Sequence, residues 1–334
     1  MKPIGSLIIN PNAGGKRAAK RSGALVTAAN SRWRTFFTSG FEAAVRQTKQ
    51  LFLDGERCCI AVGGDGALSS VLNGFMQAKQ SGPIHPEACI GVIPLGTGND
   101  TAAALGLPRD PLANLSRLET GRAVMLDVAK LIQPDKPEQF YIDICGVGFD
   151  AQVNANMDVR FKKRFGLVAY LAAVAKTLAK LHPIHVRLTL DQIEYEAPVT
   201  LIAIANGPMY GRGMKVAPLA KFNDGMLDVI IVEQVGRIEL AVNFPKVFRG
   251  THLSHPKIRM MRARSIEIQV DPPQPLSVDG ESLGCAPCKI EVMPRGVPFL
   301  LPDRCYSNAI LYDELDETPP IATREQADRA PAEV

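Results

Sequence analysis

The sequence lacks any long hydrophobic run. No stretch approaches the roughly 18 consecutive apolar residues that a membrane-spanning helix requires. The first four residues, Met-Lys-Pro-Ile, lead directly into a predicted strand and not into the regions of a signal peptide. We therefore expect a cytoplasmic protein, long enough at 334 residues to form two domains.

Regularly spaced cysteines are also missing. The chain has 7 cysteines, an odd number at irregular spacing, which favours reduced thiols over a disulfide framework. Cys285 and Cys288 are spaced like a metal-binding or redox pair, but no second pair accompanies them. A turn between two strands is the simpler interpretation, and zinc or redox chemistry is the alternative.

A strong net charge is absent as well. The formal net charge of +4 does not by itself indicate a nucleic-acid partner. The charge is unevenly distributed, because residues 313–334 contain seven acidic residues, two basic residues and three prolines. This composition predicts a disordered acidic tail.

The most informative stretch joins two apolar segments through a glycine turn. Residues 58–62 read as a buried strand, Gly63-Gly64-Asp65-Gly66 follows, and a helical pattern begins at Leu68. A helix that begins at such a turn presents free N–H groups and the positive end of its dipole, which together bind phosphate. Asp65 would repel phosphate unless a cation lay between them, so its position indicates Mg²⁺.

Two further loops of this kind follow predicted strands. Residues 89–93 lead into Pro94-Leu95-Gly96-Thr97-Gly98-Asn99-Asp100, and residues 7–9 lead into Asn10-Pro11-Asn12-Ala13-Gly14. In an open parallel sheet, ligands bind at the carboxyl ends of the strands, where these loops would converge. The first half of the chain, to about Val124, therefore predicts an α/β domain with a ligand site at this edge.

The second half of the chain has a different pattern of apolar and polar residues. Apolar residues alternate with polar ones at residues 186–190, 266–270 and 290–292, as in the strands of antiparallel sheets. Continuous apolar runs at 201–205 and 229–232 are typical of central strands. We expect an antiparallel β-sandwich over about residues 126–298.

Five motifs, in this order, resemble those of the diacylglycerol kinase catalytic family. That family includes bacterial diacylglycerol and other lipid kinases, sphingosine kinases and ceramide kinases. NAD kinases share the glycine turn but are not expected to carry the Asp-Gly-Glu segment. The motifs are Asn10-Pro11-Asn12-Ala13-Gly14, Gly63-Gly64-Asp65-Gly66, Pro94-Leu95-Gly96-Thr97-Gly98-Asn99-Asp100, Asn223-Asp224-Gly225 and Val278-Asp279-Gly280-Glu281.

The resemblance covers about residues 4–303 and implies the fold. A Rossmann-like α/β domain of the NAD-kinase and diacylglycerol-kinase type would occupy residues 1–125 and be completed by about 299–312. An antiparallel β-sandwich that binds the lipid would occupy residues 126–298. The predicted tail at 313–334 lies outside the resemblance.

The resemblance also implies an activity and its catalytic carboxylates. The chain would be an ATP-dependent, Mg²⁺-requiring lipid kinase that phosphorylates a hydroxyl of diacylglycerol or a related long-chain lipid. Asp279 would be the general base, Glu281 its nearest competitor, and Asp65 a further catalytic carboxylate. Asp127 would contact the pair formed by Asp65 and Asp100.

Binding residues carry over in the same way. The family's metal-binding turn matches Lys221, Asp224 and Met226, where the Asp224 side chain and the other two carbonyl groups would hold Mg²⁺. The residues that would bind the nucleotide are Asn10, Pro11, Asn12, Ala13, Gly14, Thr38, Gly63, Gly64, Asp65, Gly66, Ala67, Thr97, Asn99 and Asp100.

The central motif departs from the family pattern. Ala67 stands where a threonine usually follows the glycine turn, and Ser69-Ser70 replace a usual Asn-Glu pair. These changes remove a hydroxyl and a carboxylate near the nucleotide. Two alternatives therefore stay open: a catalytically weakened regulator that binds nucleotide or lipid, and a kinase for a soluble alcohol or a nucleotide.

The expected partner is a lipid substrate at the membrane surface, reached by peripheral contact. The basic residues 160–164 precede a helical pattern at 165–175 and would meet anionic headgroups. Nucleic acid is not expected as a partner, and a homodimer is one assembly that the chain could adopt.

Overall fold

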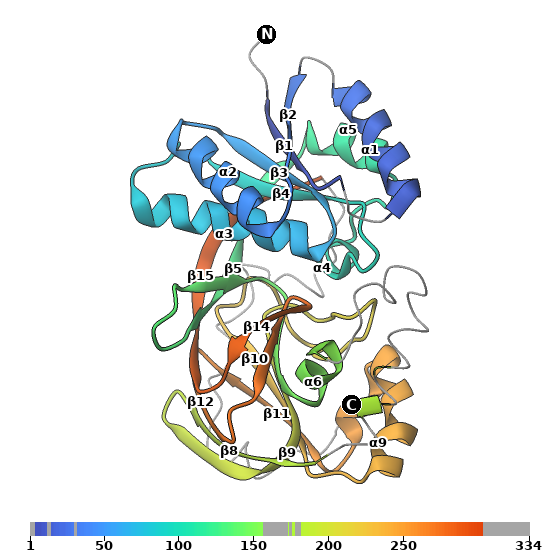
Figure 1. The fold of residues 1–334 in the computed structure, drawn as a ribbon, viewed down its shortest axis with the longest axis vertical. Helices are drawn as coiled ribbons and strands as arrows, with labels where there is room; N and C mark the ends of the chain where they lie inside the picture. Colours follow the sequence, from blue (N-terminus) through green and yellow to red (C-terminus); the bar gives the residue numbers. More distant parts are fainter. Residues whose placement is uncertain are drawn as a thin grey trace.

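Figure 1 shows a computed structural model of the protein, with an α/β part above and a mainly β part below. The structure describes residues 4–11, 15–29, 32–155, 173, 176–177 and 182–302. The predicted tail at 313–334 and the basic stretch at 160–164 lie outside the described residues, and so does the helical pattern at 165–175 apart from residue 173. Among the described residues, no helix is long and apolar enough to cross a membrane.

The α/β part is built on four parallel strands in the order β4-β3-β1-β2. Their pairing is in regular register, with Ile8 opposite Ala61 and Val62 opposite Ile93. Every residue of β1, β3 and β4 is buried, as parallel sheets covered on both faces require. The strands are β1 (Gly5–Ile9), β2 (Trp33–Phe37), β3 (Cys58–Gly63) and β4 (Cys89–Pro94).

Helices cover both faces of this sheet. Alternate strand residues point to opposite faces, so Ile8 and Ala61 pack with α2 and α3, while Leu7 and Ile60 pack with α1 and α5. The predicted α/β arrangement is confirmed. The helices are α1 (Gly15–Ala29), α2 (Phe41–Leu53), α3 (Asp65–Ser81), α4 (Asp100–Ala104) and α5 (Pro111–Leu118).

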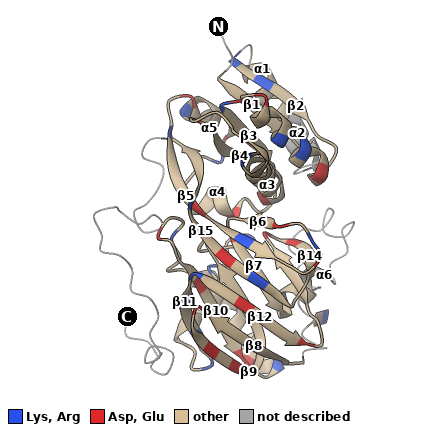
Figure 2. Ribbon diagram, turned by 90° about the vertical axis from the view of Figure 1, so that its left-hand side faces the viewer, with Lys and Arg blue, Asp and Glu red and all other residues tan. Residues whose placement is uncertain are grey.

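The second part is an antiparallel β-structure, as expected, with its own apolar core. Seven strands follow one another in the order β14-β13-β7-β9-β8-β12-β15. Among these strands, charged residues lie side by side, as Figure 2 shows, and Lys289 pairs with Glu291 at 3.0 Å. Its strands are β5 (Arg122–Ile132), β6 (Gln139–Tyr141), β7 (Ile144–Gly148), β8 (Ile184–Leu190), β9 (Ile193–Ala205), β10 (Leu227–Glu233), β11 (Ile258–Ala263), β12 (Ser265–Asp271), β13 (Pro275–Val278), β14 (Glu281–Cys285) and β15 (Cys288–Leu301).

Short helices lie on one side of this β-structure. They are α6 (Phe149–Ala155), α9 (Arg237–Asn243), η2 (Phe244–Arg249) and η3 (Thr251–Ser254). Figure 1 shows α9 at the lower right, on the outside of the strands. Cys285 and Cys288 end β14 and begin β15, so this pair spans a connection between strands.

Two long strands join the parts. β5 and β15 are antiparallel partners from Ile132 opposite Lys289 to Arg122 opposite Leu301. β15 then enters the parallel sheet, where Phe299 pairs with Ile90 of β4. The expected boundary at residues 125 and 126 thus lies inside β5, and the return of the chain near residue 299 is a strand of the first part. One continuous sheet therefore runs through both parts and fixes the positions of their facing edges.

Candidate active site

The loops after β3 and β4 touch through two glycines. A Cβ at Gly96 would lie 2.3 Å from the Cα of Gly64, closer than any side chain tolerates. The N–H of Leu95 donates to the carbonyl of Gly63 at 2.7 Å, which fixes the loops side by side. Glycine is required at this crossing because the two backbones are in contact.

Asp65 begins α3 and organises the second loop. Its carboxylate accepts hydrogen bonds from the N–H groups of Asn99 at 2.8 Å and Thr101 at 3.4 Å. Asn99 adopts a left-handed conformation (φ 61°), and its side chain both accepts from the N–H of Gly96 and donates to the Gly96 carbonyl. Burial, and then the charge of Asp100, raise the pKa of Asp65 to about 6.

Asp100 joins this loop to the β part. Its two carboxylate oxygens accept from the N–H groups of Arg212 at 2.8 Å and Gly213 at 2.7 Å. A Cβ at Gly98 would lie 2.7 Å from an oxygen of Asp65 and 3.3 Å from one of Asp100. Both predicted carboxylates therefore lie against the position of this Cβ, which leaves no space for a side chain at Gly98.

Asp279 comes from the β part and is buried. It forms a two-residue hairpin turn with Gly280 between β13 and β14, and both residues have positive φ, 46° and 82°. The N–H groups of Ile142, Asp143 and Ile144 donate to its carboxylate at 3.1–3.3 Å. Burial raises the pKa of Asp279 to about 7, and the nearby charge of Asp65 adds to the rise.

Asp143 is a fourth carboxylate that the sequence analysis missed. Its side chain is buried, and the hydroxyl of Thr101 donates to Oδ2. The Oδ1 atom has no hydrogen-bond partner among the described residues. Burial, followed by the charges of Asp279 and Asp65, raises the pKa of Asp143 well above its usual range. An aspartate between Ile142 and Ile144, in an apolar strand pattern, was the available signal.

Glu281 lies at the edge of this group. A Cβ at Gly66 would lie 3.4 Å from Oε1 of Glu281, so the exposed glutamate reaches the first turn of α3. Because the turn at 279 and 280 is tight, Asp279 and Glu281 do not lie in one extended strand. Asp279 points into the buried group, and Glu281 lies beside the predicted phosphate loop.

The remaining predicted nucleotide residues lie at the same edge of the sheet or outside the described ranges. Asn10 follows β1 and donates its N–H to the Val62 carbonyl at 3.3 Å. Thr38 follows β2, where its N–H and hydroxyl both donate to the carbonyl of Ile9. Pro11 and Thr97 are exposed. Asn12, Ala13 and Gly14 lie outside the described residues.

Comparison with known proteins places the chain in a family. The sequence profile described as "Diacylglycerol kinase catalytic domain" matches residues 5–131, and that described as "YegS C-terminal NAD kinase beta sandwich-like domain" matches residues 143–301. A protein of Xanthomonas euvesicatoria pv. vesicatoria named "Probable lipid kinase YegS-like" is 30% identical over 264 residues, which are 78% of this chain and 84% of that protein. The chain belongs to the diacylglycerol kinase family.

A second curated protein and a solved structure of the diacylglycerol kinase family are also similar to this chain. The diacylglycerol kinase of Mycobacterium tuberculosis (strain H37Rv) is 29% identical over 250 residues, 74% of this chain and 78% of that protein. The crystal structure of a diacylglycerol kinase from Bacillus anthracis str. Sterne superposes with a TM-score of 0.64 at 21% identity, covering 92% of this chain and 97% of that one. The structural likeness supports the two-part fold.

Asp127 has a different environment from the one that the family resemblance implied. Its carboxylate accepts from the N–H groups of Gly225 at 2.6 Å and Arg295 at 2.7 Å. The expected contact with Asp65 and Asp100 is thus replaced by a link between β5, β15 and the turn at 221–226. Asp143 occupies the position near Asp65 and Asp100 that was assigned to Asp127.

The turn expected to hold Mg²⁺ already faces a cation. Asp224 has a buried side chain that forms an ion pair with the guanidinium of Arg262, which also lies 3.5 Å from Asp228. Among the described residues, no group of three or more His, Cys, Asp or Glu side chains is arranged to hold a metal ion. The Asp224 carboxylate, which was expected to hold Mg²⁺ together with the carbonyl groups of Lys221 and Met226, is therefore neutralised by an arginine in this structure.

The residues that depart from the family pattern, Ala67, Ser69 and Ser70, lie in the first turns of α3. The hydroxyl of Ser70 donates to the carbonyl of Ala67 at 2.7 Å, and both Ser69 and Ser70 are buried. The serine that replaces the family glutamate therefore bonds to its own helix. This diacylglycerol kinase family member lacks the carboxylate that the usual pattern places there.

Proposed function

We propose that this protein is an ATP-dependent lipid kinase that transfers the γ-phosphate to a hydroxyl of diacylglycerol or a related long-chain lipid. The observation that carries this proposal is the position of Asp279. A buried carboxylate from the β part, held by three N–H groups, lies beside the glycine loops of the α/β part. A base for the acceptor and a phosphate-binding loop are the two components that such a transfer requires.

The nucleotide would bind at the loops after β1, β3 and β4. In the first turn of α3, the N–H of Ala67 donates to the carbonyl of Gly64 at 2.9 Å. The N–H of Gly66, one residue earlier, would bind a phosphate oxygen. The contact between Gly64 and Gly96 brings the backbones of two of these loops together at this surface. Because phosphate carries charge, a cation must separate it from Asp65 and Asp100.

That cation would be the Mg²⁺ that accompanies ATP. Mg²⁺ is usually held by one or two protein carboxylates together with phosphate oxygens and water. Asp65 and Asp100 fit this role because an oxygen of each lies close to the place that a Cβ of Gly98 would take, at 2.7 Å and 3.3 Å. Mg²⁺ would neutralise the charge that develops on the transferred group.

Asp279 would take the proton of the accepting lipid hydroxyl. As that proton moves to the carboxylate, the hydroxyl oxygen forms a bond to the γ-phosphorus, and the bond from this phosphorus to the β,γ-bridging oxygen breaks. The products are the lipid phosphate and ADP. A base pKa of about 7 suits this task, since the carboxylate is partly ionised yet strongly basic near neutral pH.

The lipid acceptor is supported by the family names alone, so the decisive experiment varies the acceptor. The protein would be incubated with radiolabelled ATP, Mg²⁺ and, separately, diacylglycerol, sphingosine, ceramide, glycerol and NAD. We expect label in an organic-phase lipid product, and loss of that label with Asp279→Asn. Label confined to glycerol or NAD would contradict the lipid acceptor and favour the soluble-substrate alternative.

A regulator is the second candidate function, and the first turn of α3 is the observation that favours it. Ala67 and Ser70 leave this turn without the family's hydroxyl and carboxylate. A regulator would bind ATP or lipid without turnover against any acceptor. Binding of ATP by thermal shift, combined with no labelled product, would support this candidate over the kinase.

A further inference from the structure

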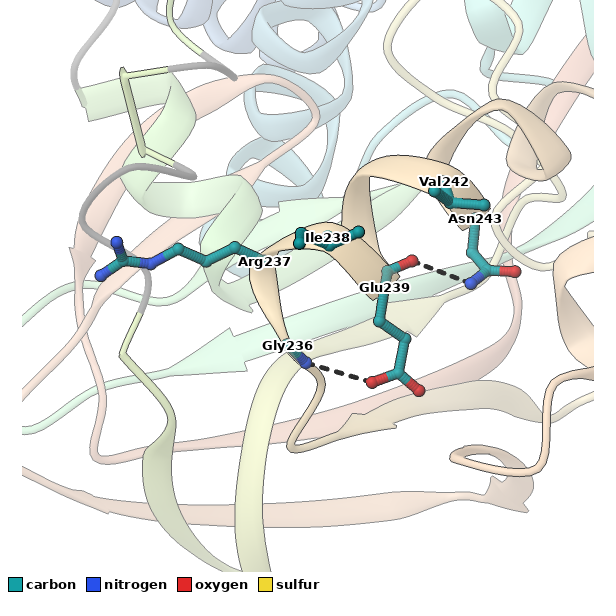
Figure 3. Close-up of a pocket in the computed structure, with 6 residues that line it drawn as sticks. All are labelled: Gly236, Arg237, Ile238, Glu239, Val242 and Asn243. Carbon is teal, nitrogen blue, oxygen red and sulfur yellow. Dashed lines mark hydrogen bonds between the residues drawn. The ribbon is translucent and has the colours of Figure 1, made fainter.

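The helices α9 and η2 expose apolar side chains to solvent. Ile238 is 82% exposed and Val242 67%, while Phe248 is 42% exposed. Ile238 and Val242 are four residues apart and so lie on one face of α9, as Figure 3 shows, where they line a shallow surface pocket. Neither α9 nor η2 has a buried residue. An apolar face of this kind on a folded domain marks a surface for interaction.

Uncompensated positive charge surrounds these apolar side chains. Four exposed cations, namely Lys215, Arg237, Lys246 and Arg249, form no ion pair with any other described residue. Glu239 is the acidic residue of α9, and its carboxylate binds the N–H of Gly236 at 3.1 Å and Lys257 at 2.9 Å. The free charges at this surface are therefore positive.

This surface continues into the candidate active site. The N–H of Lys215 donates to the carbonyl of Val247 in η2 at 3.0 Å, which ties the segment before β10 to η2. Three residues earlier, the N–H of Arg212 donates to the carboxylate of Asp100. Since a residue spans at most about 3.6 Å of chain, Lys215 lies within about 11 Å of Arg212. A partner bound on η2 would thus border the site where the acceptor enters.

We propose that the α9–η2 surface, defined by Ile238, Val242, Phe248, Lys215, Arg237, Lys246 and Arg249, docks on an anionic lipid bilayer. Exposed apolar side chains among cations match the interface of a membrane, where the former enter the acyl boundary and the latter meet anionic headgroups. The inference rests on the proposed lipid kinase function, because it supplies the route from the bilayer to Asp279. A soluble acidic protein would match the charges but not the protruding apolar face.

The test measures binding to vesicles and does not use turnover. The whole protein would be sedimented with vesicles of phosphatidylcholine alone and of phosphatidylcholine with phosphatidylglycerol. We expect binding that increases with phosphatidylglycerol, and a loss of about tenfold or more in the partition coefficient for Ile238→Ser/Val242→Ser. Arg237→Glu/Lys246→Glu/Arg249→Glu should abolish the dependence on phosphatidylglycerol. All of these side chains are exposed, so the variants should fold.

Matched controls separate this proposal from its rivals. Leu112→Ser changes an exposed apolar residue of α5 in the other part, and it should bind vesicles as the native protein does. Wild-type binding in both variants of the α9–η2 surface would overturn the proposal, as would a native dimer in solution that Ile238→Ser/Val242→Ser dissociates. Asp279→Asn should still bind vesicles, so loss of kinase activity alone would count against the proposed function only. Normal phosphorylation of detergent-dispersed lipid without vesicle binding would count against the docking surface only.

Discussion

The N–H of Asp143 donates a hydrogen bond to Oδ1 of Asp279 at 3.1 Å, and both buried aspartates belong to one cluster of acidic residues. Burial raises the pKa of both carboxyl groups, and the charge of Asp279 raises that of Asp143 further. Holding Asp279 ionised therefore depends on the three N–H groups that it accepts from. Carboxyl groups with raised pKa values that lie together in a buried place are typical of functional sites.

Replacing Asp279 tests whether it is the base. Asp279→Asn keeps the size of the side chain and removes its basicity, so turnover should fall about 10²- to 10⁴-fold while ATP binding persists. Glu281→Gln is the matched variant, and we expect a smaller loss because Glu281 lies at the edge of the acidic group. Steady-state rates and an ATP thermal shift would be measured for both. The reverse order of losses would identify Glu281 as the base.

The acid side of the pH profile follows from the same residue. Because burial raises the pKa of Asp279 to about 7, the base of the free enzyme is protonated below about pH 7. The value of kcat/KM should therefore rise with pH, about tenfold per unit at low pH, and level off above about pH 7. Glu281→Gln should keep this limb. A native profile that is flat between about pH 5 and pH 8 would contradict the assignment.

Local patterns predicted the loops, whereas tertiary contacts decided which carboxylates meet. The turn around Gly64 and the loop around Gly96 were predictable because a strand, glycines and a helix follow one another in the sequence. Asp143 was missed because its neighbours Thr101 and Asp279 are 42 and 136 residues away. Arg262 lies 38 residues from Asp224, and no local signal links an arginine in a β-strand to a distant turn.

Gly96 should tolerate no side chain. A Cβ there would lie 2.3 Å from the Cα of Gly64, so Gly96→Ala must separate the two loops. We expect the variant to lose the ATP-dependent thermal shift and to unfold at a lower temperature. Gly23→Ala is the control, because a Cβ at Gly23 in α1 meets nothing within 4 Å. An unchanged ATP shift in a folded Gly96→Ala protein would show that the nucleotide binds elsewhere.

Restoring the family threonine distinguishes the two candidate functions. Ala67→Thr adds a hydroxyl beside the predicted phosphate site, and a neutral hydrogen bond contributes about 0.5–1.5 kcal/mol. In a working kinase we expect an unchanged or modestly increased rate, and a lower KM for ATP. A change from undetectable to robust turnover would instead favour the regulator. Rates with radiolabelled ATP over a range of ATP concentrations would measure this.

The turn at 221–226 should not respond to Mg²⁺ in the native protein. Arg262 neutralises Asp224 and lies beside Asp228, so a chelator added without nucleotide should leave the unfolding temperature unchanged. Arg262→Met leaves two acids with buried side chains unpaired, and breaking such a pair costs about 3–5 kcal/mol, less here because Arg262 is partly exposed. The variant should therefore unfold at a temperature several degrees lower.

Mg²⁺ should then restore part of the lost stability in Arg262→Met, because a divalent cation can occupy the space between the freed carboxylates. Arg259→Met is the matched control: Arg259 also lies on β11 and pairs with Glu233 at 2.5 Å, away from the turn. It should lose stability without gaining a response to Mg²⁺. Calorimetry of the three proteins with Mg²⁺ and with a chelator would decide. Equal responses in both variants, or a native protein that a chelator destabilises, would show that arginine does not take the place of the metal.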